Sequence, residues 1–247
     1  WECESNDNTY LIFDEDGVPS TQYRLPGEDG FVDPRGADRM RNPDLPPGLV
    51  GQEKNPIFDD GFEDFIFEAK NVKDAVKAAS KKSAFLSGGQ TLIPSMKLRL
   101  SSFDDVINVK NIKDLQGIKV SSKSVTIGAA TTHAEVAASK DIKKAIPSLS
   151  HLAGMIGDAQ VRNKGTLGGS IANNDPSACY PSACIALDAT IHTSDRKIEA
   201  SKFFKGMFET ALKKDELVTA VEFKIPESSS YVKIPNPASR YAMVGVY

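Results

Sequence analysis

Two short segments with adjacent glycines constrain this chain more than any other feature. The first reads LSGGQTL from Leu86 to Leu92, and the second reads GTLGGS from Gly165 to Ser170. In the first, a short apolar strand is expected to end at Gly88-Gly89 before a helix begins near Thr91. Adjacent glycines permit backbone conformations closed to other residues, so successive N–H groups can form a concave anion site. Two such loops, about 80 residues apart, would be able to cradle the two phosphates of one dinucleotide from opposite sides.

Neither segment matches the two best-known nucleotide motifs. No Gly-Lys-Ser/Thr follows at the spacing of a Walker loop, and neither segment fits the pattern G-x-G-x-x-G. A tight turn without any ligand also explains an isolated pair of glycines. Spacing alone therefore leaves two interpretations open, which are simple turns or a dinucleotide site outside the Rossmann and P-loop classes.

The chain changes in character near residue 60. Residues 1–60 carry 14 acidic and 5 basic residues, a net charge of −9, and they hold 7 of the 14 prolines. Residues 61–247 carry 25 basic and 19 acidic residues, a net charge of +6. We interpret residues 1–60 as an acidic, Pro-rich extension of unknown role that is irregular or disordered. The alternative is a segment that wraps a basic face of its own domain or of a partner.

The overall composition excludes several classes of protein. The net charge of −3 argues against a nucleic-acid binder, and no apolar run approaches the roughly 18 residues of a membrane span. The three cysteines, Cys3, Cys179 and Cys184, form neither a disulfide framework nor the spacing of a metal or iron–sulfur site. We therefore expect no metal site and a cytoplasmic protein. No signal peptide is visible, and because the chain begins at Trp1 we expect that a natural start was lost or processed.

Strands and helices are interleaved along the rest of the chain. A helix is expected after Asn71, because Val72, Ala75, Val76 and Ala79 recur at the spacing of one helix face. Further strands are expected at 84–86, 106–109, 125–128, 190–193 and 217–225, further helices at 91–98, 132–139, 147–156 and 180–187, and a long glycine-rich loop at 165–176. The regular long crossovers of a doubly wound sheet are missing. The pattern predicts an α+β fold with two subregions around one ligand cleft.

Several of these segments together resemble one protein family. LSGGQTLIP from Leu86 to Pro94, with MKLRL from Met96 to Leu100, looks like the first flavin loop of that family. IGDAQVRN at 156–163, followed by GTLGGS, resembles its second loop, and IGAATT at 127–132 resembles the strand and turn between them. The family is the FAD-binding medium subunit of molybdenum hydroxylases, as in aerobic-type carbon monoxide dehydrogenase and xanthine dehydrogenase. The resemblance extends from about Phe62 to Pro226.

This resemblance implies a fold, a cofactor and a set of site residues. The fold is the two-subdomain α+β FAD-binding architecture of the vanillyl-alcohol oxidase-like (PCMH-type) class, over residues 61–228, and the cofactor is FAD. Residues 229–247 then read as the beginning of a C-terminal α+β domain, so the sequence is expected to be a fragment or a truncated gene product. The cofactor-binding residues implied are Ser87, Gly88, Gly89, Gln90 and Thr91 for the pyrophosphate, Thr166, Leu167, Gly168, Gly169 and Ser170 on the other side, Asn174 and Asp175 as polar contacts, and Tyr241 near the isoalloxazine. A solvated loop at 174–175 and an ordinary strand at 241 are the alternatives.

The resemblance also implies an enzymatic role and partners. In the family, a large subunit with a molybdenum cofactor oxidises the substrate, and a small subunit with 2Fe–2S clusters receives the electrons. FAD on the medium subunit then passes them to NAD or a quinone, so no catalytic acid or base is expected in this chain. Two alternatives remain, a stand-alone flavoprotein oxidoreductase with the same fold and a degenerate scaffold subunit without flavin.

One position departs from the family pattern. Members commonly carry an acidic residue where this chain has Cys179, and that residue hydrogen-bonds the cofactor ribose. A thiol is a weak donor and acceptor, and losing a charge-assisted contact costs roughly 1.5–3 kcal/mol. We therefore expect weaker FAD retention than in a typical member.

The remaining charged and titratable residues near the loops receive less specific predictions. His133 is expected to be structural, because it sits at the start of a helix. Lys97 and Arg99 either meet phosphates or lie on a solvated helix face. Arg162 is expected to contact a phosphate or a neighbouring subunit.

Overall fold

The computed structural model describes residues 3–6, 9–12 and 66–247, and the chain divides into two compact units, Trp1–Asn55 and Pro56–Tyr247. In the first unit, β1 (Cys3–Asn6) pairs antiparallel with β2 (Thr9–Ile12). An irregular segment is predicted here, and these two strands differ from that prediction. The pairing follows from the run Thr-Tyr-Leu-Ile, because β-branched and aromatic residues favour strands. The remaining predictions for residues 1–60 lie outside the described residues.

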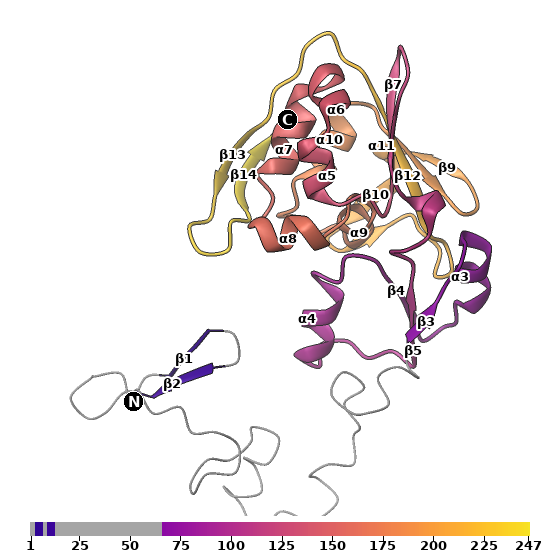
Figure 1. Cartoon of the computed structure of the whole chain (residues 1–247), viewed down its shortest axis with the longest axis vertical. Coiled ribbons are helices and arrows are strands. Elements are labelled where there is room, and N and C mark those ends of the chain that lie inside the picture. The colour runs from indigo at the N-terminus through magenta and orange to yellow at the C-terminus, as the bar shows by residue number, and fades with distance from the viewer. Residues whose placement is uncertain (1–2, 7–8, 13–65) are drawn as a thin grey trace, which may run out of the picture. The chain divides into compact units, whose positions relative to one another are not determined.

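The second unit begins with a small parallel sheet that carries the first glycine loop. Its strands β3 (Ile66–Glu68), β5 (Asp105–Asn108) and β4 (Ser83–Leu86) lie in that order. The connections contain α3 (Val72–Ala78) and α4 (Leu92–Lys97), and Figure 1 shows both helices beside the three strands. The predicted cap of α3 is confirmed, because the Asn71 side chain accepts a hydrogen bond from the Asp74 N–H at 2.9 Å.

A larger antiparallel sheet follows, with the strand order β6-β7-β12-β8-β9. Its central strand β12 (Val218–Lys224) pairs with β7 (Ser124–Gly128) and β8 (Thr190–Thr193), while β6 (Ile118–Val120) and β9 (Lys197–Glu199) form the edges. One face of β7 and β12 is fully buried, as the alternating apolar residues predict. This buried face consists of Val125, Ile127, Val221 and Phe223.

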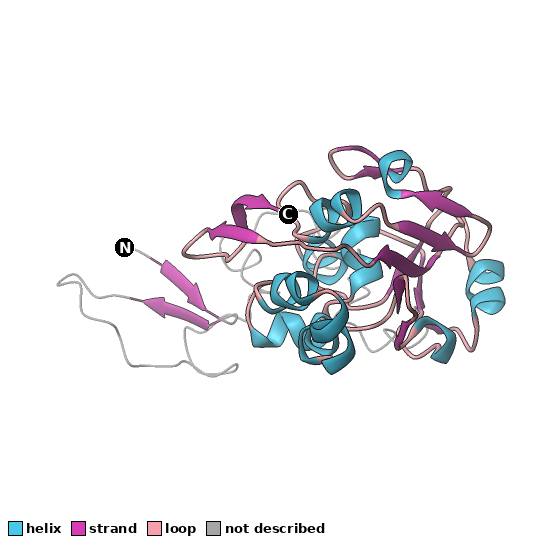
Figure 2. Cartoon of the chain, turned by 90° about the horizontal axis from the view of Figure 1, so that it is seen from above, coloured by secondary structure: helices cyan, strands magenta, loops and turns pink. Residues whose placement is uncertain are grey.

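Helices cover the buried face of this sheet, and Figure 2 shows them gathered beside its strands. The first of them, α5, begins at a capping box in which the Thr132 hydroxyl accepts from the Glu135 N–H and the Glu135 carboxylate accepts from the Thr132 N–H. None of the helices in residues 66–247 combines the length and hydrophobicity that a bilayer crossing requires. The helices of this region are α5 (His133–Ala138), α6 (Lys140–Ala145), α7 (Pro147–Gly154), α8 (Ala159–Lys164), α9 (Leu167–Asn173), α10 (Tyr180–Ala186) and α11 (Ala200–Phe203), with a 3-10 turn at Lys113–Leu115.

The prediction of a long glycine-rich loop at 165–176 is wrong, because most of this segment forms the helix α9. Thr166 begins the helix by accepting a hydrogen bond from the Gly169 N–H at 3.2 Å. Leu167 and Ile171, four residues apart on one face, are fully buried in the main core. The low helix propensity of the two glycines is therefore outweighed by the Thr166 cap and by the burial of the apolar side chains.

Two hairpins complete the unit. The first pairs β10 (Phe204–Gly206) with β11 (Glu209–Thr210), and the second pairs β13 (Val232–Pro235) with β14 (Ala242–Val246). The turn of the second hairpin is organised by the Asn236 side chain, which accepts from the Ala238 and Ser239 N–H groups.

Candidate functional site

The two glycine loops meet in the structure, although 79 residues separate Ser87 from Thr166 in sequence. Their hydroxyl oxygens lie 3.0 Å apart, within hydrogen-bond distance. A Cβ atom on Gly88 would lie 2.5 Å from the Lys164 carbonyl oxygen and 2.6 Å from the Gly165 Cα. Gly88 is therefore required for the close approach of one loop to the other.

The first loop presents unpaired N–H groups. Within the described residues, the N–H groups of Gly88, Gly89, Gln90 and Thr91 donate to no backbone or side-chain acceptor. Gly89 has a φ of +72°, the left-handed conformation that glycine adopts without strain. Successive free N–H groups around such a residue form a concave anion site. This loop therefore has the chemistry that the sequence predicts for a pyrophosphate cradle.

The second loop differs, because its N–H groups are already used. Leu167 N–H donates to the Thr131 carbonyl at 3.1 Å, Gly168 N–H to the Ala129 carbonyl at 2.8 Å, and Ser170 N–H to Thr166. These donors would have to give up internal hydrogen bonds to hold a phosphate. The arrangement favours a role as a wall opposite the first loop.

The side chains of the second loop divide into buried and accessible groups. Thr166, Leu167 and Gly168 are buried, and a Cβ on Gly168 would lie 2.5 Å from that of Ala129. The glycine at 168 thus serves helix-to-strand packing and not the close approach of a ligand that the sequence predicts. Gly169 and Ser170 retain accessible surface.

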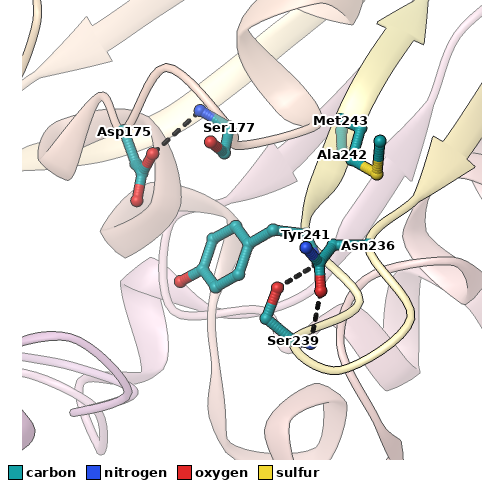
Figure 3. Close-up of a pocket in the computed structure, with 7 residues that line it drawn as sticks. All are labelled: Asp175, Ser177, Asn236, Ser239, Tyr241, Ala242 and Met243. Carbon is teal, nitrogen blue, oxygen red and sulfur yellow. Dashed lines mark hydrogen bonds between the residues drawn. The ribbon is translucent and has the colours of Figure 1, made fainter.

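A pocket of about 510 Å³ lies between the segment after α9 and the hairpin β13–β14. Asp175 and Tyr241, both predicted cofactor residues, line it together (Figure 3). The Asp175 carboxylate accepts a hydrogen bond from the Ser177 N–H at 2.8 Å. Partial burial raises the pKa of the Tyr241 phenol, and the charge of Asp175 adds to this. The pocket therefore holds one carboxylate and one protonated phenol.

Several residues that line the pocket are not predicted from the sequence. All but Ser177, which follows α9, come from the turn and second strand of the hairpin, whose sequence signal is the turn-forming stretch Asn236-Pro237. The hairpin itself is local, but packing between segments far apart in sequence places its turn opposite Asp175, and such packing leaves no local pattern. The missed lining residues are Ser177, Asn236, Ser239, Ala242 and Met243.

Asn174 does not line this pocket. Its side-chain amide donates to the carbonyl oxygens of Gly206 at 2.8 Å and Glu209 at 2.9 Å, and its φ of +46° ends α9. Asn tolerates this conformation better than most residues. Asn174 thus ties α9 to the hairpin β10–β11.

Cys179, the position that departs from the family pattern, is buried. Cys179 Sγ lies 3.4 Å from the Lys233 ammonium nitrogen, and neither residue is among those that line the pocket. The expected weaker retention of FAD stays a prediction, which dialysis of the loaded protein tests. Among residues 66–247, no group of three His, Cys, Asp or Glu side chains is arranged to hold a metal ion.

The basic residues near the loops have different environments. Both hydrogen bonds of the Arg162 Nη1 go to backbone carbonyls, those of Ile156 at 3.0 Å and Gly157 at 2.9 Å. This assigns Arg162 to holding the turn before α8. Lys97 and Arg99 are exposed at the end of α4, and their predicted alternatives stay open.

His133 lies behind the second loop and is buried, with its ring 5.4 Å from that of Tyr180. Burial lowers the pKa of His133 to about 4, and the charge of Arg162 adds to the effect. A histidine that is neutral in the fold and charged in the unfolded chain favours unfolding as the pH falls. The unfolded pKa of 6.5 and the folded value of about 4 place this effect between those two pH values.

We expect this histidine to lower the free energy of unfolding by about 2 kcal/mol between pH 7 and pH 5. Urea titrations at several pH values across that range measure how steeply the free energy of unfolding depends on pH. This dependence should be weaker in His133→Gln. The exposed His151 supplies a matched control, because His151→Gln should keep the slope of the unmodified chain. Equal slopes in all three proteins would contradict the assignment.

Comparison with known proteins agrees with this geometry. Residues 60–227 match the family described as the FAD binding domain in molybdopterin dehydrogenase. The chain is 37% identical over 186 residues to the glyceraldehyde dehydrogenase medium chain of Sulfolobus acidocaldarius, covering 72% of this chain and 66% of that one. It is 31% identical over 188 residues to the carbon monoxide dehydrogenase medium chain of Hydrogenophaga pseudoflava, covering 71% and 65%.

A solved structure gives the same result. Reconstituted CO dehydrogenase from Oligotropha carboxidovorans superposes with a TM-score of 0.70 at 30% identity, covering 73% of this chain and 66% of that chain. The α+β FAD-binding fold predicted from the sequence is therefore confirmed. The chain spans about two thirds of the length of these relatives. The family match over residues 60–227, together with the converging loops, shows that this chain belongs to the family of FAD-binding domains of molybdopterin dehydrogenases.

Proposed function

We propose that this chain is the FAD-binding electron-transfer subunit of a molybdenum-containing hydroxylase or dehydrogenase. The observation that carries the proposal is the convergence of the two loops, which leaves unpaired N–H groups on the first and a packed wall on the second. The named relatives are medium chains of dehydrogenases. Their description as medium chains supports a complex with other subunits.

The residues present fit FAD. The anion site of the first loop suits a pyrophosphate, because its donors have no competing partner within the described residues. A side chain at Gly88 would fill the space where the two loops meet. The pocket of about 510 Å³ just after α9, the helix that carries Gly169 and Ser170, offers room and polar groups for another part of the cofactor.

Each part of the site then has a distinct task. Ser87 and residues 88–91 bind the pyrophosphate, and Gly169 with Ser170 bounds the cofactor on the opposite side. Asp175, oriented by the Ser177 N–H, accepts a hydrogen bond, and Tyr241 offers a ring face and a hydroxyl that stays protonated at neutral pH. When bound, FAD supplies two-electron redox chemistry, while the protein sets its position.

The wider role requires partners. We infer that a large subunit with a molybdenum cofactor oxidises the substrate and that a small subunit with 2Fe–2S clusters delivers the electrons to this chain. NAD or a quinone is the proposed acceptor. This division of labour leaves the chain to bind, orient and shield its cofactor.

Absorbance spectroscopy of the purified chain tests the cofactor. Bands of bound oxidised flavin should appear after reconstitution with FAD and gel filtration. A correctly folded but colourless protein would instead favour a scaffold subunit without flavin. Thermal unfolding of both samples establishes that the protein is folded.

Co-purification from the native source tests the complex. Mass spectrometry should identify a molybdenum-cofactor subunit and an iron–sulfur subunit bound to this chain. If the chain isolates alone and turns over a small substrate, it is a stand-alone flavoprotein, and the subunit role is wrong.

A further inference from the structure

A buried cluster of three polar side chains lies where β13 passes the start of α10. Lys233, on β13, is only 8% exposed, and its ammonium donates to the Met155 carbonyl at 2.9 Å. Its second neighbour is the Cys179 sulfur at 3.4 Å. Cys179 is 6% exposed and comes directly before α10. The cluster therefore places an amine nitrogen against a thiol sulfur inside the protein.

Tyr231 adds a third group to this cluster. It is 4% exposed, and its hydroxyl lies close enough to the Cys179 thiol to interact with it. Burial raises the pKa of this phenol well above its ordinary range, and the neighbouring Cys179 adds to the rise. Tyr231, Cys179 and Lys233 therefore form one buried polar cluster, with the sulfur between the phenol and the amine.

The surroundings of Lys233 are unusual for a buried ammonium. Such groups are normally paired with a carboxylate, but no ion pair of Lys233 forms among the described residues. Its side-chain partner is the Cys179 thiol, a group that can be oxidised.

The second cysteine of the region, Cys184 in α10, provides a comparison with Cys179. Cys184 is fully buried, and burial raises the pKa of its thiol far above the ordinary value. Its side chain forms no hydrogen bond in the part of the chain that the structure describes. Any chemistry that depends on a neighbouring amine should therefore separate Cys179 from Cys184.

We propose that Cys179 and Lys233 form a covalent sulfur–nitrogen cross-link when the protein is exposed to hydrogen peroxide. In the first step, the Cys179 thiol reduces one peroxide molecule, its O–O bond breaks, and sulfenic acid and water form. In the second, Lys233 loses a proton to solvent, and its neutral amine attacks the sulfur. The S–O bond breaks, a second water leaves, and a sulfenamide remains. The sulfur has lost two electrons, and the peroxide has gained them.

The cross-link would connect two walls of the pocket. Asp175 and Ser177 lie just before Cys179, whereas Lys233 precedes the turn that carries Tyr241. A bond between the two residues would also replace a buried positive charge by a neutral group. We therefore expect the hairpin β13–β14 to be held against the start of α10 in the oxidised protein, whether or not FAD is bound.

Peptide mass spectrometry of the full chain tests the bond, after treatment with peroxide and digestion without reductant. A linked peptide pair should appear that is lighter by two hydrogen atoms than the sum of the two peptides, and thiol reductant should abolish it. Cys184→Ser should keep the pair, and Cys179→Ser should lose it. A pair that is heavier by an oxygen atom would overturn the direct sulfur–nitrogen bond.

Dimedone, which traps sulfenic acids, gives a readout that does not depend on recovering the linked peptides. Lys233→Arg keeps the charge but lacks the attacking amine, so Cys179 should be labelled several-fold more than in the unmodified chain. Lys233→Gln gives a second variant if the first does not fold. Equal labelling with and without the lysine, or a Cys179 as inert to peroxide as Cys184, would overturn the proposal.

Discussion

Replacing Gly88 by alanine is expected to weaken FAD binding by about tenfold or more. The added Cβ would lie 2.5 Å from the Lys164 carbonyl oxygen and 2.6 Å from the Gly165 Cα. Both are backbone atoms, which cannot rotate away as a flexible side chain can. The loops must therefore separate, and the 3.0 Å contact between the Ser87 and Thr166 hydroxyls would lengthen or break.

The size of this effect follows from the cost of overpacking. Inserting a methyl group into a closely packed contact costs about 1–3 kcal/mol. If that cost falls on the loop arrangement that binds the pyrophosphate, the dissociation constant rises about tenfold for each 1.4 kcal/mol. Titrating the apoprotein with FAD and following flavin fluorescence measures the change.

Gly154→Ala is the matched control for this substitution. A Cβ at Gly154 would meet only the Ala137 Cβ at 3.9 Å, an ordinary contact distance. Because Gly154 ends α7, alanine there should leave FAD binding unchanged and leave stability equal or slightly higher. FAD affinity in Gly88→Ala equal to that in Gly154→Ala would show that the loop contact is not needed for binding.

The glycine loops and most elements could be predicted from sequence because their signals are local. The Asn71 cap, the apolar stripe after it and the alternation in β7 and β12 each depend on residues a few positions apart. A strand that ends at adjacent glycines can also be recognised from a few neighbouring residues. These signals are strong enough to place the first loop correctly.

The tasks of individual site residues could not be predicted in the same way. Whether an N–H group is free depends on partners far along the chain, as the bond from Gly168 to the Ala129 carbonyl shows. Asn174 is tied to β10–β11, more than 30 residues later. The pocket at Asp175 forms only because a hairpin near the end of the chain lies opposite. Each of these contacts is a property of the packed fold.

Leu167 is the clearest case of a residue whose task depends on the packed fold. Leu167→Ala is expected to reduce the free energy of unfolding by about 2–5 kcal/mol. The sequence placed this residue among those that contact the cofactor. In the structure its side chain is fully buried and belongs to the main core with Ile127, Ile171 and Val221. Removing it leaves a cavity between α9 and the sheet, which costs both transfer free energy and lost contacts.

Urea denaturation of the apoprotein measures this loss, and Leu100→Ala is its control. Leu100 is 77% exposed, so the same substitution there should change the free energy of unfolding by less than about 0.5 kcal/mol. Because Leu167 packs in the core whether or not the cofactor is bound, most of the loss should appear without FAD. A stable apoprotein that loses only FAD affinity would instead mean that the Leu167 side chain contacts the cofactor. The comparison therefore separates the role of α9 as a packed wall from a role in direct contact with the flavin.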